Sequence, residues 1–146
     1  MSHYLICLDI GGTKVLGVIF DTNRQIVHRI KKKTKANGEG FKNIEDTIIT
    51  VVEELMSEFG ITTNDVIAIA AGAPGVINMD KGIVLFSPNL PWKNYAIKKA
   101  IEDRFHRPFF IGNDVNLGVI GEWTYGVAKG LDQVIGLFIG TGMGSG

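Results

Sequence analysis

Cysteine is nearly absent from this 146-residue chain, which has Cys7 and no other. An internal disulfide and a zinc site built from several cysteines are therefore excluded. An excess of charge of one sign is also lacking, because 15 Lys and Arg residues balance 15 Asp and Glu residues. This balance gives no general reason to expect nucleic acid or an anionic membrane as a partner, and we expect neither. Cys7 lies in an apolar run and is predicted to be a small core residue.

Long apolar runs are missing as well, so no transmembrane helix is predicted. No signal peptide is expected either, and together with the single cysteine this favours a reducing, cytoplasmic location. What the chain does contain is 45% hydrophobic residues and 19 glycines. This composition predicts a globular domain of ordinary size, with a real core and many turns.

The first apolar run, residues 5–10, leads into a glycine turn and back into a second strand over residues 15–20. The turn offers a carboxylate, two glycines, a hydroxyl and a cation, in the order Asp9, Gly11, Gly12, Thr13 and Lys14. The glycines let backbone N–H groups approach a ligand closely, so the turn predicts a phosphate site with a metal ion nearby. The alternative is a tight hairpin whose glycines only supply positive φ, with the carboxylate capping its own turn.

The next segments predict a mixed sheet. Residues 25–34 favour a third consecutive strand, and their basic residues are interpreted as protection of an edge strand rather than a nucleic-acid patch. Apolar residues at helical spacing predict a helix over residues 41–59, followed by a buried strand over 66–71. Because a strand, a helix and a strand in succession imply a parallel pair with a right-handed crossover, ligands are expected beyond the carboxyl ends of these strands.

A short hairpin is predicted over residues 76–86, and a rigid loop follows from Ser87 to Trp92. Asn89 stands between two prolines in this loop. One hypothesis makes Ser87 and Asn89 hydrogen-bonding groups for a polyhydroxylated ligand. The other has Asn89 merely closing a turn.

A helix over residues 97–105 and a parallel strand over 108–112 are predicted next. Asp114 follows at the same sheet edge as the first glycine turn, where it is either an ordinary helix N-cap or a site residue. The helix it opens is predicted over residues 115–125. A buried strand is expected over residues 134–139 and a second glycine-rich turn over 140–146, whose spacing differs from the G-x-G-x-x-G pattern of dinucleotide sites.

Five motifs occur in one order along the chain: DIGGTK at 9–14, GAPG at 72–75, SPNLPW at 87–92, NDVN at 113–116 and GTGMGSG at 140–146. Together they resemble the ROK family of bacterial glucokinases, other sugar kinases and sugar-responsive repressors. The resemblance implies an actin-like ATPase (RNase H-like) α/β fold, in which two lobes close around sugar and ATP. It also implies that residues 1–126 form the amino-terminal lobe and that residues 127–146 begin the second lobe, so the chain is expected to be a fragment.

The resemblance also implies roles for individual residues. Asp9 would help to place a magnesium ion, indirectly, and Asp114 would be the catalytic base. The expected sugar contacts are Gly75, Asn89, Asn113 and Asp114. The expected nucleotide contacts are Asp9, Gly11, Gly12, Thr13, Lys14, Gly140, Thr141, Gly142 and Gly144.

The family's Glu-x-x-His sugar motif and cysteine-rich zinc site are not found in these 146 residues. Zinc is therefore expected only in a missing carboxyl-terminal part, and the chain alone is expected to be inactive. ATP and Mg²⁺ are the implied cofactors, and a homodimer is expected for the full-length protein.

The favoured hypothesis is an ATP-dependent kinase that phosphorylates the 6-hydroxyl of glucose or a related hexose. The main alternative is the sugar-binding domain of a ROK-type transcriptional repressor. Such repressors carry a helix-turn-helix segment before this lobe, whereas DIGGTK begins here at Asp9. A third possibility, an actin-like or chaperone-type ATPase, would not need the motifs at 87–92 and 113–116.

Overall fold

A computed structural model describes residues 3–34, 42–139 and 143–146. The elements of the central part are β1 (Tyr4–Ile10), β2 (Lys14–Phe20), β3 (Ile26–Lys33), α1 (Lys42–Phe59), β4 (Val66–Ala73), α2 (Ile97–Phe105), β8 (Phe109–Asn113) and α3 (Asp114–Tyr125). The smaller elements are the 3₁₀ turn Thr63–Asp65 and the strands β5 (Val76–Asn78), β6 (Ile83–Phe86), β7 (Lys93–Tyr95), β9 (Leu137–Ile139) and β10 (Met143–Ser145).

The central sheet has five strands in the order β3-β2-β1-β4-β8. The first three strands along the chain are antiparallel to one another, whereas β4 runs parallel to β1 and β8 runs parallel to β4. The predicted mixed sheet is therefore confirmed. The basic strand β3 lies at the sheet edge, as its lysines indicate.

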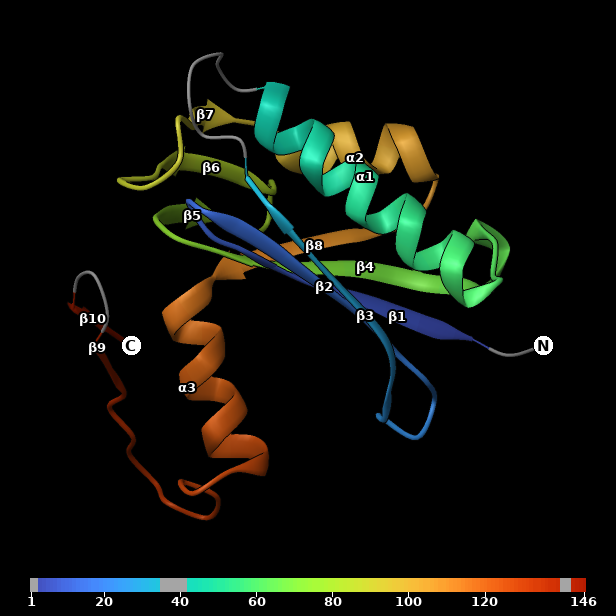
Figure 1. Cartoon of the computed structure of the whole chain (residues 1–146). Coiled ribbons are helices and arrows are strands. Elements are labelled where there is room, and N and C mark those ends of the chain that lie inside the picture. The colour runs from blue at the N-terminus through green and yellow to red at the C-terminus, as the bar shows by residue number, and fades with distance from the viewer. Residues whose placement is uncertain (1–2, 35–41, 140–142) are drawn as a thin grey trace.

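One face of this sheet is covered by α1 and α2, while α3 lies on the opposite side (Figure 1). Because side chains alternate along a strand, Ile6 and Ile10 of β1 point towards α1, and neither is exposed to solvent. The apolar stripe of α1 closes this core with Ile44, Ile48, Val51, Val52 and Leu55. Each such isoleucine contributes about 1.5 to 3 kcal/mol through burial.

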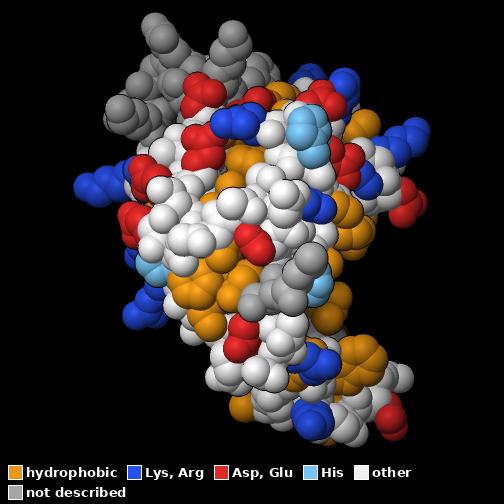
Figure 2. All heavy atoms as spheres, turned by 90° about the vertical axis from the view of Figure 1, so that its right-hand side faces the viewer, with side chains coloured by type: hydrophobic (Ala, Val, Ile, Leu, Met, Phe, Trp, Pro, Cys, Tyr) orange, Lys and Arg blue, Asp and Glu red, His pale blue; other side chains and the backbone are white. Residues whose placement is uncertain are grey.

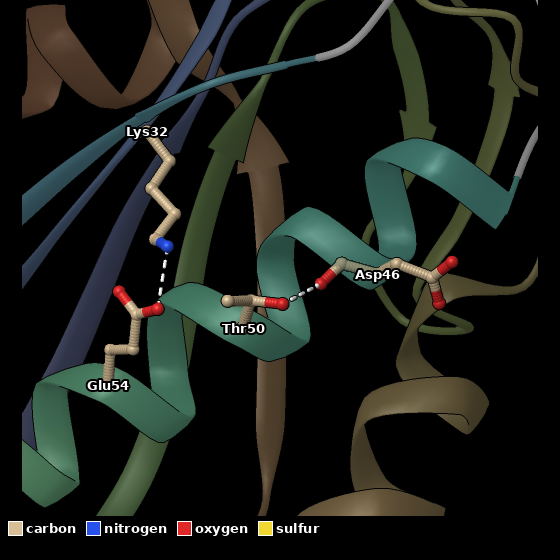
Figure 3. Close-up of polar contacts among 4 residues, drawn as sticks. All are labelled: Lys32, Asp46, Thr50 and Glu54. Carbon is tan, nitrogen blue, oxygen red and sulfur yellow. Dashed lines mark hydrogen bonds and ion pairs between the residues drawn. The ribbon is translucent and has the colours of Figure 1, made fainter.

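The exposed side of α1 makes polar contacts to β3 and within the helix itself. Lys32 of β3 reaches the carboxylate of Glu54 with 2.6 Å between Nζ and Oε1, and the Thr50 hydroxyl donates to the carbonyl of Asp46 at 2.7 Å (Figure 3). Both members of the ion pair are about one third exposed. Exposed pairs of this kind contribute little, so the apolar stripe accounts for most of the stability of α1.

Helix α2 ends where its sequence indicates. Its C-cap, His106, adopts a left-handed conformation with φ of 53°, and Pro108 follows two residues later. The N–H of His106 donates to the carbonyl of Glu102 at 2.9 Å, which closes the last turn.

The opposite sheet face is less covered. Leu5, Ile67 and Phe110 are 40%, 49% and 58% exposed there. Viewed from the right-hand side of Figure 1, hydrophobic side chains reach the surface on both the broad upper body and the narrower lower part (Figure 2). No helix among the described residues is long and apolar enough to cross a membrane.

Two sequence predictions fail in the last segment. The strand expected to be buried over residues 134–139 is short, and Leu137 and Ile139 are 64% and 83% exposed, because among the described residues β9 pairs only with β10. The glycine-rich stretch is not turn throughout, since Met143–Ser145 forms β10. Strand β7, which follows the proline-rich loop directly, was also not predicted. It pairs with β6, the strand that precedes the loop.

Candidate functional site

The site lies where three parallel strands end. Asp9 is near the carboxyl end of β1 and pairs in register with Gly72 of β4, which in turn pairs with Gly112 of β8. The first turn of α3 follows directly, and a Cβ atom built on Gly72 would lie 3.5 Å from the Cα of Asp114. The expected convergence of polar turns at this edge is therefore present for Asp9 and Asp114.

A pocket of about 430 Å³ opens between this edge and α3. Both carboxylates, Asp9 and Asp114, line it. The volume of the pocket is left free by small lining residues, which are Ala70, Ala71, Gly72, Gly112 and Gly118. Larger apolar side chains form the rest of the wall: Cys7, Leu8, Met79, Phe110, Ile111 and Leu117.

The negative charge of Asp114 acts on the carboxylate of Asp9. Partial desolvation in the pocket wall and the negative charge of Asp114 raise the pKa of Asp9, and the cation of Lys14 opposes this rise. Like charges that share a site favour protonation of one of them or the arrival of a cation. Asp9 would suit magnesium, which binds proteins through one or two carboxylates and takes its remaining ligands from water and phosphate. Among the described residues no group of three or more His, Cys, Asp or Glu could hold a metal.

The start of α3 is organised by Asn113 rather than by Asp114. The Asn113 side chain accepts a hydrogen bond from the N–H of Asn116 at 3.0 Å and donates to the carbonyl of Gly75 at 3.1 Å. The interpretation of Asp114 as an ordinary N-cap is therefore wrong. Its Oδ1 accepts from the N–H of Val115 at 2.9 Å, and no other hydrogen bond to this carboxylate occurs within the described part of the chain.

Gly75 adopts a φ of 121°, which few other residues tolerate. A side chain there would also collide with the carbonyl of Phe86 and the Cα of Ser87. Gly75 thus lets β4 turn tightly beneath the proline-rich loop. Its carbonyl is held by Asn113, so two of the residues expected to contact sugar are hydrogen-bonded to each other.

The first glycine turn is closed by backbone hydrogen bonds. The N–H of Gly11 donates to the carbonyl of Lys14, and the N–H of Thr34 donates to the carbonyl of Thr13, both at 2.9 Å. Neither Gly11 nor Gly12 has a positive φ, so the hypothesis that they only supply positive φ is wrong. Thr13 is exposed in the turn, and Lys14 is exposed at the start of β2.

The proline-rich loop separates its two candidate residues. Asn89 is exposed at the tip, whereas Ser87 is only 4% exposed and its hydroxyl has no hydrogen-bond partner among the described residues. Ser87 is therefore not placed to meet a ligand, because the loop folds it inward. Asn89 does not line the pocket, but its carbonyl faces the first glycine turn at Gly12.

The second glycine-rich stretch is only partly described. Gly140, Thr141 and Gly142 lie outside the described residues. Gly144 lies in β10, and a Cβ atom there would be 2.8 Å from a methyl group of Val115 in the first turn of α3. The described part of this stretch therefore approaches the same helix end as Asp114.

A family model, described as the ROK family, matches residues 5–146. The chain belongs to the ROK family. It is 33% identical to a glucokinase of Streptomyces coelicolor over 97% of its own length and 42% of that protein. It is also 29% identical to the xylose repressor of Bacillus subtilis over 99% of its length and 37% of that protein.

A crystal structure of a ROK family glucokinase from Streptomyces griseus, in complex with glucose and AMPPNP, superposes with a TM-score of 0.83. That protein is 32% identical, and the match covers 97% of this chain and 43% of that one. The chain thus has the actin-like ATPase fold of ROK proteins and spans less than half the length of each of these three relatives.

Several pocket residues of this ROK chain were not predicted from sequence, notably Met79, Phe110 and Cys7. The prediction of Cys7 as a core residue is wrong, because its side chain is half-buried in the pocket wall. The alternation along β1 and β8 carried a signal for two of them, because Cys7 and Phe110 fall between buried neighbours and must face the other side of the sheet. Burial raises the pKa of the Cys7 thiol, which disfavours its reactive thiolate. Met79 lies in the turn between β5 and β6, where no local pattern indicates a ligand.

Proposed function

We propose that the protein to which this chain belongs is an ATP-dependent sugar kinase that phosphorylates the 6-hydroxyl of glucose or a related hexose. The observation that carries this proposal is the meeting of Asp9 and Asp114 in one pocket at the carboxyl edge of the sheet. Two carboxylates suit phosphoryl transfer, which needs charge neutralisation at the phosphates and a base for the attacking hydroxyl.

Asp114 is proposed as that base. Its Oδ1 is held by the N–H of Val115, which fixes the carboxylate and leaves Oδ2 to accept a proton. As the sugar oxygen bonds to the γ-phosphorus, its proton passes to Asp114 and the bond to the β-phosphate oxygen breaks, so that ADP leaves. Asn113, Gly75 and Asn89 are proposed to hold the sugar hydroxyl groups beside this base.

The nucleotide phosphates are proposed to lie at the two glycine-rich stretches. The first turn would contribute Gly11, Gly12, Thr13 and Lys14. The N–H of Gly11 already bonds to the carbonyl of Lys14, so we expect the Thr13 hydroxyl, the Lys14 cation and the close approach of the backbone at Gly12 to serve the phosphates. The second stretch would contribute Gly140, Thr141, Gly142 and Gly144. When bound, magnesium neutralises charge on the phosphates, and Asp9 is the residue that would help to hold it.

We also infer that residues 1–126 form the first lobe and that residues 127–146 begin a second. The central sheet and the helices that cover it lie between Tyr4 and Tyr125. After α3, the strands β9 and β10 form a separate two-stranded sheet. An association of two copies in the full-length protein remains part of this proposal.

The test uses the complete protein encoded by the reading frame. Magnesium-dependent ADP release is measured with glucose, mannose, fructose, N-acetylglucosamine and N-acetylmannosamine. Asp114→Asn should lower kcat by about 10² to 10⁴, because it removes the base. Asp46→Asn is a matched control, since Asp46 is exposed on α1 and Figure 3 shows its side chain directed away from the labelled contacts.

Sugar-dependent release that disappears in Asp114→Asn and persists in Asp46→Asn supports the kinase. Equal activity of Asp114→Asn and wild type would show that the base lies elsewhere. Release that is independent of every sugar would indicate a plain ATPase instead.

A sugar-binding domain of a transcriptional repressor is the second candidate, and the match to the xylose repressor favours it. In that case a sugar should raise the melting temperature of the complete protein without any ADP release. Binding of the complete protein to DNA, weakened by that sugar, would then distinguish a repressor from an inactive kinase.

A further inference from the structure

Gly12 lies unusually close to the proline-rich loop. A Cβ atom built on Gly12 would be 2.7 Å from the carbonyl oxygen of Asn89 and 3.5 Å from the Asn89 Cβ. Real Cβ atoms do not approach other atoms within 3.0 Å. Because the closer atom belongs to the backbone, rotation of a side chain cannot relieve the contact.

The backbone conformation of Gly12 does not require glycine, since its φ is not in the left-handed region. Gly11 differs from it, because a Cβ atom on Gly11 would meet only the carbonyl of Lys14, at 3.2 Å, within the same turn. Gly11 therefore serves closure of the turn, whereas Gly12 serves the approach of a loop from elsewhere in the chain.

The first glycine turn and the proline-rich loop, which form this contact, are each held in place by a backbone hydrogen bond. The turn is tied to the end of β3 by the hydrogen bond from Thr34 to Thr13. The loop is closed by the N–H of Ser87, which donates to the carbonyl of Trp92 at 3.2 Å, and Trp92 is 1% exposed. The tip with Asn89 is the exposed part of the loop, so a side chain on Gly12 would displace the tip rather than the base.

We propose that Gly12 is a positioning residue for the sugar, which it serves through Asn89. The first glycine turn then sets the place of a sugar-binding amide as well as that of the phosphates. This inference rests on the proposed function, because it takes Asn89 as a sugar contact. Its consequence is that a change at Gly12 weakens sugar binding even when no nucleotide is present.

The experiment measures glucose binding to the complete protein by isothermal titration calorimetry, without nucleotide. Gly12→Ala should lower glucose affinity about tenfold, because the added methyl group displaces Asn89 and weakens its hydrogen bond to the sugar. Gly11→Ala, the matched variant in the same turn, should have a smaller effect. In an Asn89→Ala background, Gly12→Ala should cause little further loss, since the group it displaces is already gone.

Unchanged glucose affinity in Gly12→Ala overturns the inference and leaves the proposed function standing. Full additivity of Gly12→Ala and Asn89→Ala also overturns it. Failure of the wild type to bind any of the five sugars removes the proposed function and this inference with it.

Hydrogen exchange of the wild-type protein provides a readout that does not depend on folding of a variant. Glucose alone should slow amide exchange in residues 11–14 as well as in residues 87–92, because the loop tip rests on the turn. Protection confined to residues 87–92 would overturn the inference.

Discussion

The two faces of the central sheet are built from the same strands and serve different purposes. On the face covered by α1 and α2, Ile6, Ile10 and Ile19 are fully buried. On the other face, the intervening positions of β1 carry Cys7 and Asp9, which line a pocket. The alternation of a strand thus separates stability from chemistry within one element.

Glycine shows the difference most clearly. Gly17 of β2 faces α1, and a Cβ atom there would lie 2.5 Å from Val51 and 2.8 Å from Leu55. Gly72 of β4 faces α3, and its nearest neighbour would be at 3.5 Å, an ordinary contact. The covered face therefore has no room for a methyl group at Gly17, whereas the open face has that room at Gly72, beside the pocket.

The largest effect on stability is expected from Gly17→Ala compared with Gly72→Ala. Gly17→Ala should lower the free energy of unfolding by about 1 to 3 kcal/mol, because it overpacks the contact with α1. Gly72→Ala should leave it within about 0.5 kcal/mol, since the nearest atom to its methyl group lies at an ordinary contact distance of 3.5 Å. Urea unfolding of the complete protein measures both values.

Gly72→Ala should instead reduce kcat/KM for the proposed kinase reaction, because the methyl group fills part of the pocket beside Asp114. Equal destabilisation by the two variants would show that the faces are packed alike. That result would remove the distinction drawn between them.

A smaller, pH-dependent effect is expected from Asp9→Asn. The raised pKa of Asp9 means that the folded protein holds this proton more tightly than the unfolded chain does. The stability from this group is complete below the ordinary pKa of about 3.9 and is lost as pH rises through the raised value. In a metal-free buffer, Asp9→Asn should therefore melt at the same temperature as wild type near pH 3 and at a higher one near pH 7.

Thermal unfolding followed by circular dichroism across this pH range measures the difference. A lower melting temperature for Asp9→Asn at pH 7 would contradict the idea that the ionised Asp9 carboxylate destabilises the folded protein. Magnesium with nucleotide should reduce the advantage of Asp9→Asn, because the cation compensates the paired carboxylates.

The smallest effect is expected at the surface of the covered face, in the pair of Lys32 and Glu54. Both side chains are about one third exposed, so their coupling should be below about 1 kcal/mol. A double-mutant cycle of Lys32→Ala and Glu54→Ala, measured by urea unfolding at low and high salt, tests this. A coupling that exceeds the effect of Gly17→Ala would mean that charge, rather than packing, holds α1.

The sequence predicted the helices and strands in which apolar residues recur at regular spacing. The apolar spacing of residues 41–59 gave α1, and the alternating or continuous apolar runs gave the five strands of the sheet. The sequence predicted the two carboxylates of the pocket but not all of its apolar wall. Asp9 and Asp114 were named from motifs, whereas Met79 reaches the pocket from a turn whose position depends on the packing of β5 and β6.

Two of the failures share a physical cause, which is that burial depends on partners far away in the chain. Residues 134–139 are apolar enough for a buried strand, but burial requires a second surface, and β9 has only β10 beside it within the described residues. One hypothesis made Ser87 a ligand-binding hydroxyl, but its side chain is buried. The residues next to it in sequence do not show whether a loop side chain points inward or outward.

The sequence by itself determined the strand and helix periods, the edge strand with its lysines, and the order of the five motifs. The predicted sheet already indicated that Asp9 and Asp114 share one edge. Only the tertiary structure decided that Asn113 bonds to Gly75 and that Gly12 contacts Asn89. Periodicity is a property of neighbouring residues, so it can be read along the chain. The contact of Gly12 with a loop more than 70 residues away depends on how the β-sheet brings distant turns to one edge.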